Sequence, residues 1–178
     1  GEPLDRRHLL GTCFLLLLAG IDTTWSAIGS SLWHLATHPE DQARLRAEPD
    51  LIDSAVEELL RVYSPVTMAR EVIADVEVAG CPMKPGDKVL MSFPAANRDP
   101  AHFEKPDEFI IDRERNRHVA FGSGIHRCLG SNLARMELRV AIEEWLTRIP
   151  TFELADPAAV TWTGGQVRGP RTIPVRWS

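Results

Sequence analysis

A glycine-bearing segment at residues 121–130 brings a cysteine to the start of a predicted helix. Its sequence is Phe-Gly-Ser-Gly-Ile-His-Arg-Cys-Leu-Gly, and the cysteine is Cys128. The unpaired amides and the positive dipole end of a helix N-terminus stabilise a thiolate, and glycines let the backbone come close enough to donate to the sulfur. This pattern favours an anionic metal ligand at Cys128.

The other two cysteines, Cys13 and Cys81, lack such surroundings. Three cysteines form neither an even disulfide framework nor the Cys-x-x-Cys spacing of a zinc site. A cysteine is most often a small buried hydrophobe. We expect that role for Cys13 and Cys81.

An acid and an alcohol follow a glycine inside a predicted helix near the N-terminus. Gly20 costs about 1 kcal/mol relative to alanine there, so its presence beside Ala19 indicates that something approaches the backbone closely. Asp22 and Thr23 come next. Taken alone, Thr23 could bond back to a carbonyl one turn earlier, and Asp22 could be a satisfied or solvated acid.

Helix formers and prolines predict the helices that position these groups. A long, largely buried helix over about residues 4–37 precedes a short one that starts at Pro39 and runs to about residue 47. A third helix begins near residues 49–50 and ends before Ser64-Pro65. It carries Glu58 and Arg61 at i, i+3, which on a helix surface is worth only about 0.2–0.5 kcal/mol.

After the third helix, the sequence predicts short strands, a long loop and one further helix. Short stretches at residues 71–74, 76–78 and 88–93, separated by turns, predict a small antiparallel sheet. Residues 94–127 are interpreted as a long ordered loop, which usually has a function. A helix over about residues 129–148 and a hairpin around Gly164-Gly165 complete one structural unit over residues 1–178, mainly α with a small antiparallel β-sheet.

At this point the residues resemble a known family. Phe-x-x-Gly-x-His-x-Cys-x-Gly at residues 121–130 resembles the cysteine-ligand loop of cytochromes P450. Glu58-Leu-Leu-Arg61 resembles the family's Glu-x-x-Arg helix, and Ala19-Gly-Ile-Asp-Thr-Thr24 resembles its oxygen-activating helix. Asn97-Arg-Asp-Pro100 is similar to bacterial members. The resemblance implies the C-terminal, haem-carrying portion of the P450 fold, from a family chain more than twice this long whose upstream half is absent here.

The resemblance implies a role for each motif residue. Cys128 would be the proximal iron ligand of haem b (iron protoporphyrin IX), whose thiolate favours O–O cleavage. Asp22 and Thr23 would pair so that the hydroxyl orients oxygen and the carboxylate relays protons, with Thr23 preferred to Thr24 because it directly follows the acid. The other cofactor contacts would be Phe121, Gly122, Ala19, Gly20 and, at the propionates, His126 and Arg70 at the start of the first strand.

Two further groups follow from the same resemblance. Glu58 and Arg61 would be buried and joined by Arg113, which would tie the loop beneath the haem to the helix. A partial, mostly apolar substrate wall would be formed by Leu15, Leu18, Ala19, Val66, Thr67, Met68 and Val167.

Charge and hydropathy limit the partners. A net charge of -5 argues against a general nucleic-acid surface. Six arginines form a basic cluster, which is usually a solvated surface but would suit an acidic electron donor such as a ferredoxin or flavoprotein reductase: Arg113, Arg115, Arg117, Arg127, Arg135 and Arg139. The apolar run at residues 9–21 is shorter than the ~20 residues that span a bilayer, and no signal-peptide cleavage site is evident. We expect no membrane contact and a cytoplasmic location.

We therefore predict a bacterial haem-thiolate monooxygenase that inserts one atom of dioxygen into an apolar organic substrate. Two alternatives remain: a haem-thiolate peroxygenase or isomerase, and a truncated chain that folds without binding haem and is inactive alone. Asp22 and Thr23 favour the monooxygenase, because peroxide-driven or redox-neutral chemistry does not need their proton relay.

Overall fold

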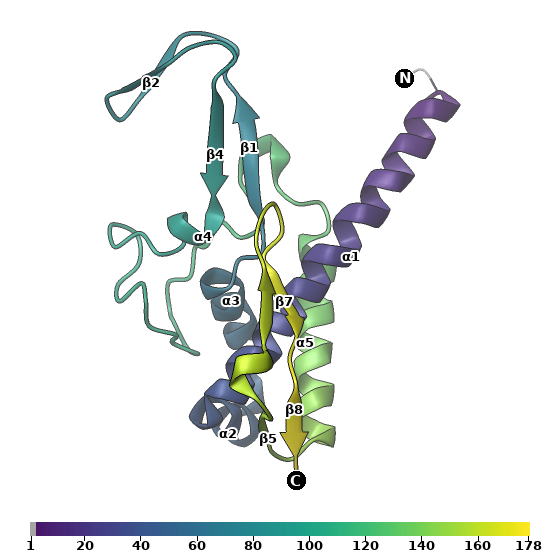
Figure 1. Ribbon diagram of the computed structural model, residues 1–178, viewed down its shortest axis with the longest axis vertical. Helices are drawn as coiled ribbons and strands as arrows, with labels where there is room; N and C mark the ends of the chain where they lie inside the picture. Colours follow the sequence, from purple (N-terminus) through teal and green to yellow (C-terminus); the bar gives the residue numbers. More distant parts are fainter. Residues whose placement is uncertain (1–2) are drawn as a thin grey trace.

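A computed structural model describes residues 3–178, with helices forming the body and short antiparallel strands around it (Figure 1). The long helix α1 (Arg6–Thr37) is capped by Asp5, whose carboxylate accepts the His8 amide at 2.8 Å. Pro39 opens α2 (Pro39–Ala47), and a 3-10 turn, η1 (Pro49–Leu51), leads into α3 (Ile52–Val62). Helix α5 covers Ser131–Arg148. The predicted fold class and the order of the helices are confirmed.

The hydrophobic core lies where the C-terminal half of α1 meets α2, α3 and α5. Removing these apolar side chains from water is the main favourable term in folding. The most deeply buried of them are Leu35, Leu45, Ala55, Val56, Leu59, Ile111, Leu138 and Ile142.

A buried polar cluster joins α1, α2 and α3 at the same end of the body. The His34 ring is 1% exposed, with Nδ1 at 2.8 Å from the Tyr63 hydroxyl and Nε2 at 2.8 Å from Asp41 Oδ2. The His38 ring stacks on it at 4.1 Å between centroids. Burial, assisted by the charge of His38, lowers the pKa of His34 to about 3, so the ring is neutral at physiological pH.

The strands form two-stranded antiparallel ladders. In the upper arm of Figure 1, β1 (Thr67–Glu71) pairs with β4 (Lys88–Ser92), and β2 (Val76–Val78) pairs with β3 (Cys81–Met83) across an Ala79-Gly80 turn with positive φ at both residues. In the C-terminal part, β5 (Phe152–Leu154) pairs with β8 (Val175–Trp177), and β6 (Thr161–Thr163) pairs with β7 (Gly169–Thr172). The predicted hairpin around Gly164-Gly165 is therefore β6–β7.

Two sequence-based predictions about this region are corrected. The first strand lies at Thr67–Glu71 rather than residues 71–74, because Val66 bridges to Val167 and the Thr67 amide donates to the Gln166 carbonyl. This long-range pairing is invisible in local composition. The predicted loop at residues 94–127 also contains two short helical turns, α4 (Phe93–Ala96) and η2 (Gly124–His126), and a third, η3 (Pro157–Ala159), lies in the tail.

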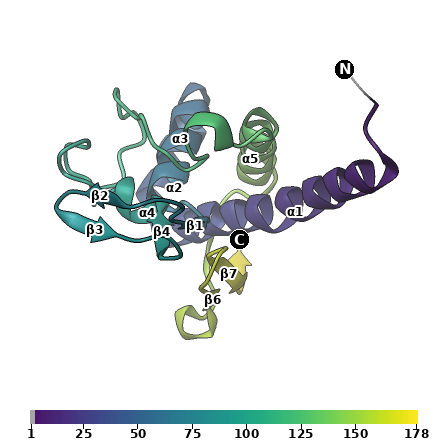
Figure 2. The same ribbon diagram turned by 90° about the horizontal axis from the view of Figure 1, so that it is seen from above.

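The N-terminal half of α1 departs most from expectation. We predicted a largely buried helix, but the large apolar side chains between Leu9 and Ile21 are each more than half exposed, and the buried positions begin at Ser26. This half projects from the body as a free arm, apart from the β1–β4 arm (Figures 1 and 2). Apolar composition shows that a face needs covering but not which segment covers it. By length and composition alone, α1 is also long and apolar enough to cross a membrane, a test that core helices of soluble proteins pass too.

The C-terminal hairpin packs tightly on the middle of α1. A Cβ atom at Gly169 would lie 2.5 Å from Ser26 Cβ, and one at Gly29 would lie 3.1 Å from Pro170 Cγ. Both glycines are thus needed for close approach of β7 to the helix. This packing places β7 next to residues 22–29, where the predicted acid and alcohol lie.

Candidate functional site

The cysteine loop is closed by its own backbone. The Cys128 amide donates to the Phe121 carbonyl at 2.8 Å, and the Gly122 amide donates to the Val119 carbonyl at 2.9 Å. Gly122 and Gly124 adopt φ of 69° and 65°, a left-handed conformation that residues with side chains rarely adopt. The glycines therefore give the loop its shape, as the motif indicated.

The Cys128 side chain lies exposed just before α5. Gly130 is the N-cap residue, and a Cβ atom on it would stand 4.0 Å from the Cys128 sulfur. The sulfur thus lies near Gly130 at the start of an 18-residue helix. Cys13 and Cys81 are also exposed, so the expectation that they are buried is wrong for the part of the chain described.

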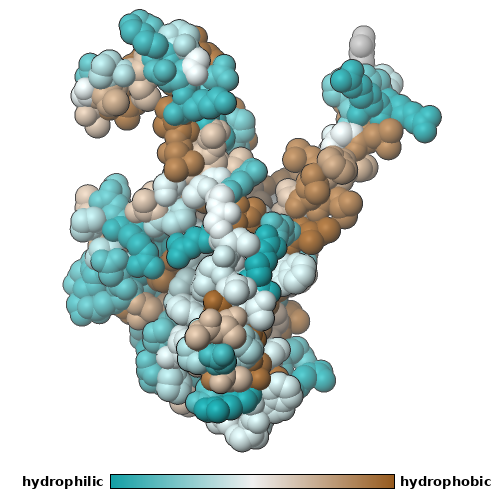
Figure 3. All heavy atoms as spheres, viewed as in Figure 1, coloured by the Kyte–Doolittle hydropathy of each residue, from teal (hydrophilic) through white to brown (hydrophobic). Residues whose placement is uncertain are grey.

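Exposed apolar side chains lie on the cysteine loop, on β4 and on α5. On the cysteine loop, Ile125 is 97% and Leu129 87% exposed, and Leu90 and Met91 on β4 are exposed as well. Further exposed apolar side chains lie on α5: Leu133, Met136 and Val140. Figure 3 shows apolar residues along the α1 arm and an open notch between that arm and the β1–β4 arm. So much unpartnered apolar surface marks a place where a ligand or another protein segment binds.

The acid and the alcohol lie side by side on α1. The Thr23 hydroxyl donates to the Ala19 carbonyl at 2.7 Å, which is the local bond that mid-helix threonines commonly make. The Asp22 carboxylate accepts from Arg171 of β7 at 3.3 Å. No atom would contact a Cβ placed on Gly20 within 4 Å among the described residues, so the space beside this turn is open. Sequence reasoning missed Arg171, because only the packing of β7 on α1 brings it there.

The three side chains predicted to form a structural triad meet in the body. Glu58 and Arg61 are both 0% exposed, and Arg113 Nε lies 3.0 Å from each Glu58 oxygen. The Glu58 carboxylate also accepts from the Ile110 amide and from the Asn116 side chain. Desolvation opposes ionisation, but these donors outweigh it and lower the pKa of Glu58. The alternative of a weak surface pair therefore does not apply.

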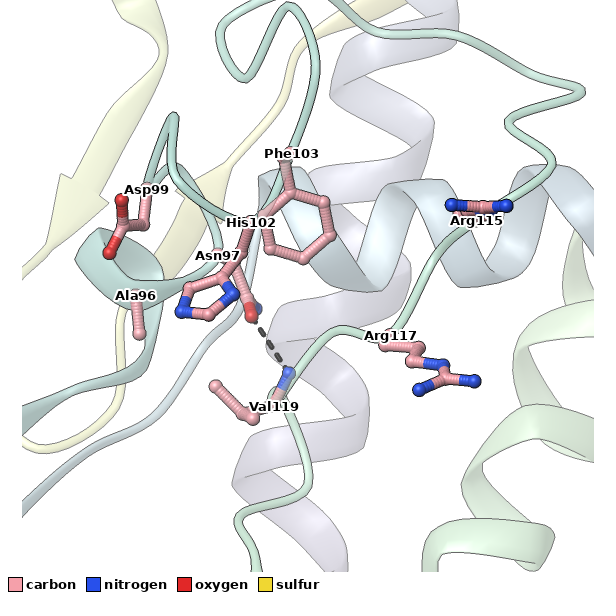
Figure 4. A pocket seen from close by; sticks show the side chains of 8 residues that line it. All are labelled: Ala96, Asn97, Asp99, His102, Phe103, Arg115, Arg117 and Val119. Atoms are coloured by element: carbon pink, nitrogen blue, oxygen red, sulfur yellow. Dashed lines mark hydrogen bonds between the residues drawn. The ribbon is translucent and has the colours of Figure 1, made fainter.

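Asn97 extends this network towards the cysteine loop. Its carbonyl accepts from Arg61 Nη1 at 2.8 Å, and its side chain donates to the Ser64 hydroxyl. Asn97 Oδ1 accepts the Val119 amide at 2.8 Å, as Figure 4 shows. The motif at residues 97–100 was noticed in the sequence, but this role of its first residue was not. The side chain links α3 to the segment that leads into the cysteine loop.

A cavity of about 790 Å³ lies beside this link and apart from the predicted site residues. Figure 4 shows the residues that line it: Ala96, Asn97, Asp99, His102, Phe103, Arg115, Arg117 and Val119. It belongs to the long loop rather than to the surface around Cys128.

The predicted propionate contacts are both exposed. Arg70 is the fourth residue of β1 rather than the first residue of a strand, and its Nη1 donates only to the adjacent Ala69 carbonyl among the described residues. His126 ends the η2 turn in the cysteine loop. Their side chains are thus accessible to an acidic group.

The predicted substrate wall divides into two parts. Val66 bridges to Val167, and the Thr67 hydroxyl donates to the Gly165 carbonyl at 2.8 Å. Met68 follows on β1 and contacts Gln166 through its sulfur. Leu15 and Leu18 lie on the free half of α1, 63% and 55% exposed.

The six arginines of the basic cluster do not share one surface role. Arg113 binds Glu58, Arg135 binds Glu57, and Arg139 pairs with Glu143 and Asp53. The other three arginines form no ion pair with an acidic side chain among the described residues: Arg115, Arg117 and Arg127. The cluster thus contains three arginines in ion pairs, of which Arg139 is exposed, and three exposed arginines without an acidic partner in the described part of the chain.

Comparison with known proteins identifies relatives across the whole chain. The family model described as Cytochrome P450 matches residues 1–157. Cytochrome P450 105C1 of a Streptomyces species is 46% identical over 98% of this chain and 47% of the relative. Vitamin D3 dihydroxylase of Streptomyces griseolus is 42% identical over 98% of this chain and 44% of the relative.

Solved structures agree with this match. The Bacillus subtilis bacillaene polyketide synthase cytochrome P450 PksS superimposes with a TM-score of 0.95 at 41% identity, over 100% of this chain and 47% of that one. P450BioI, solved in complex with an acyl carrier protein ligated to hexadec-9Z-enoic acid, gives a TM-score of 0.93 at 40% identity, over 100% and 47%. The chain spans about half the length of the relatives it matches.

Proposed function

Because the chain belongs to the cytochrome P450 family, whose model and relatives match it nearly end to end, we propose that it is the haem-carrying portion of a monooxygenase. The reaction proposed is insertion of one atom of dioxygen into an apolar organic substrate. The observation that carries the proposal is the exposed Cys128 sulfur just before α5, on a glycine-shaped loop that also carries the exposed apolar side chains Ile125 and Leu129.

The residues present fit the haem that family membership implies, and we propose haem b. A thiolate ligand needs an accessible sulfur near helix amides, which Cys128 has, and a porphyrin face needs apolar neighbours, which Ile125 and Leu129 offer. Arg70 and His126 would meet the propionates. When bound, this group supplies the activation of dioxygen.

Asp22 and Thr23 would handle the protons of the reaction. The Asp22 side chain is 43% exposed, so its carboxylate can exchange protons with solvent. The Thr23 hydroxyl uses its proton to bond the Ala19 carbonyl, which leaves its oxygen lone pairs free to accept a proton donor. Together they form a short relay from water to the interior of the site. This relay favours a monooxygenase over a peroxygenase or an isomerase.

The exposed arginines suggest how electrons arrive. Arg115, Arg117 and Arg127 would attract an acidic donor such as a ferredoxin or flavoprotein reductase. Replacing each with glutamine should slow reduction and weaken its dependence on salt. Equal rates and salt dependence in the variants would contradict the assignment.

The exposed apolar side chains on the free half of α1 must be covered either by another protein segment or by lipid. We assign this role to the part of the family chain outside these 178 residues, rather than to lipid, since the relatives continue for more than half their length beyond the match. This assignment is compatible with the cytoplasmic location that we propose. Sedimentation of the full-length protein with the membrane fraction would contradict it.

The absorption spectrum of the reduced protein with carbon monoxide tests the proposal. Thiolate-ligated haem gives a characteristic red-shifted band, which should vanish in Cys128→Ala and persist in Cys13→Ala and Cys81→Ala. The measurement belongs on the full-length protein and, separately, on the 178-residue chain. Haem binding by the first and not the second supports the alternative that this portion folds without haem, whereas no thiolate band in either refutes the proposed function.

A further inference from the structure

Arg135 is held in place by an acid on a neighbouring helix. From α5 it reaches Glu57 of α3 with two hydrogen bonds, Nε to Oε1 at 2.6 Å and Nη2 to Oε2 at 2.9 Å. Such a bidentate pair fixes the plane of the guanidinium as well as its distance. The hydrogen bonds from His118 and Arg135 outweigh the desolvation of Glu57 and lower its pKa to about 2, so the pair is ionised at physiological pH.

His118 completes the support of Glu57. Its Nε2 lies 3.1 Å from Glu57 Oε2, while its Nδ1 accepts the Ala120 amide at 3.2 Å. Since Nδ1 is an acceptor, the network assigns the ring proton to Nε2, which donates to the carboxylate. Glu57 thereby connects α5 to the backbone immediately before the cysteine loop.

The other face of Arg135 contacts the cysteine loop itself. Its guanidinium carbon lies 4.6 Å from the centre of the Phe121 ring, within the range of a cation–π interaction. Phe121 is the residue whose carbonyl accepts the Cys128 amide. Arg135 is therefore fixed by Glu57 along one edge and by Phe121 across its face.

The guanidinium charge lies in the second turn of α5, the helix that follows Cys128. Hydrogen bonding to Glu57 raises the pKa of Arg135, so the group remains charged. The Arg135 side chain is 29% exposed, so water screens this interaction only in part. Arginine alone combines the two-pronged donor, the flat stacking face and a permanent charge; lysine supplies only the charge.

We propose that Arg135 is a positioning residue for the cysteine ligand: anchored by Glu57, it sets the conformation of Phe121, whose carbonyl binds the Cys128 amide, and it places a permanent positive charge against the cysteine loop. This rests on the proposed function in so far as Cys128 carries the haem iron. Arg135 thus has a role apart from the three exposed arginines assigned to the electron donor. A positive charge near a thiolate-ligated iron stabilises the reduced state. Arg135 would therefore raise the haem reduction potential above the value it would have without this charge.

The experiment compares variants of the full-length haem protein. Arg135→Gln should lower the haem reduction potential and shift the carbon monoxide band, and Arg135→Lys should restore part of the potential but not the loop geometry. The matched control is Arg139→Gln, one helical turn further along α5 and paired with Glu143 at the surface. Its potential and band should equal those of the wild type.

If the Arg135→Gln protein does not bind haem, a double-mutant cycle tests the inference instead. The combination of Arg135→Lys with Phe121→Leu should then be non-additive in the reduction potential, because each change removes the same stacked contact. Wild-type potential and band in Arg135→Gln, or additive effects in the cycle, would overturn the inference. Absence of a thiolate band in the wild type would instead refute the proposed function, so the two failures are distinguishable.

Discussion

Glu58 and Arg61 face each other one helical turn apart with both side chains fully buried. Arg61 Nε lies 2.8 Å from Glu58 Oε2, and Nη2 lies 2.8 Å from Oε1. The remaining Arg61 donors reach three backbone carbonyls of the long loop, those of Asn97, Pro106 and Glu108. The pair thus anchors the loop that leads to the cysteine ligand to α3.

Glu58→Ala should strongly destabilise the protein. Removing one partner of a buried pair leaves the other charge uncompensated, which costs about 3–5 kcal/mol. Denaturant unfolding of the protein measures this loss. Glu77→Ala, at an exposed position on β2, is the matched control and should change the free energy of unfolding by less than about 0.5 kcal/mol. A loss of under about 1 kcal/mol for Glu58→Ala would contradict the structural role of the pair.

The buried His34 should make stability depend on pH. Its folded pKa of about 3 lies below its ordinary value of 6.5, so between these pH values the unfolded chain binds a proton that the folded chain does not. The contribution is complete above pH 6.5 and is lost as the pH falls towards 3, by up to about 1.4 kcal/mol per pH unit.

Comparing wild type with His34→Gln tests this dependence. The difference in the free energy of unfolding between the two should shrink as the pH falls from 7 to 4, because only the wild type carries the ring. His102→Gln, at an exposed position, should parallel the wild type across the same range. A difference that stays constant with pH would show that the ring takes up its proton without cost.

Thr23→Ala should uncouple electron use from product formation in the full-length enzyme. The change removes the hydroxyl beside Asp22 while leaving the helix intact, and general acid–base groups contribute about 10²-fold or more. Product and peroxide per electron consumed are the measurements. Thr24→Ala is the neighbouring control and should stay close to the wild type. Unchanged coupling in Thr23→Ala would refute the assignment.

Gly169→Ala should destabilise the packing of β7 on α1. The new methyl group would lie 2.5 Å from Ser26 Cβ and 3.0 Å from its Cα, so the strand or the helix must move. Overpacking of this kind costs about 1–3 kcal/mol. Gly164→Ala, whose Cβ would meet no atom of the described residues within 4 Å, is the control for thermal or denaturant unfolding. Equal stability of the two variants would argue against the close contact.

The contact between Gly169 and Ser26 affects the candidate site as well as stability. Because β7 carries Arg171, a shift of the strand would also move the cation that binds Asp22. Gly169→Ala should therefore change turnover of the full-length enzyme as well as stability, whereas Gly164→Ala should change neither.

Local patterns were enough to predict the helices, the turn glycines and the motif residues of the cysteine loop. Pro39 with two acids marks a helix start, and Gly122 and Gly124 occupy left-handed positions, because these properties depend on neighbouring residues only. The family resemblance rested on such motifs, and the comparisons confirmed the family.

Contacts between distant residues were decided by the tertiary structure alone. The register of β1 depends on its bridge to Val167, the charge partner of Asp22 comes from β7, and Arg135 was assigned to a surface before its bonds to Glu57 were known. The exposure of the apolar half of α1 has the same cause. Side-chain type limits which contacts are favourable, but chain packing over long sequence separations determines which of them form.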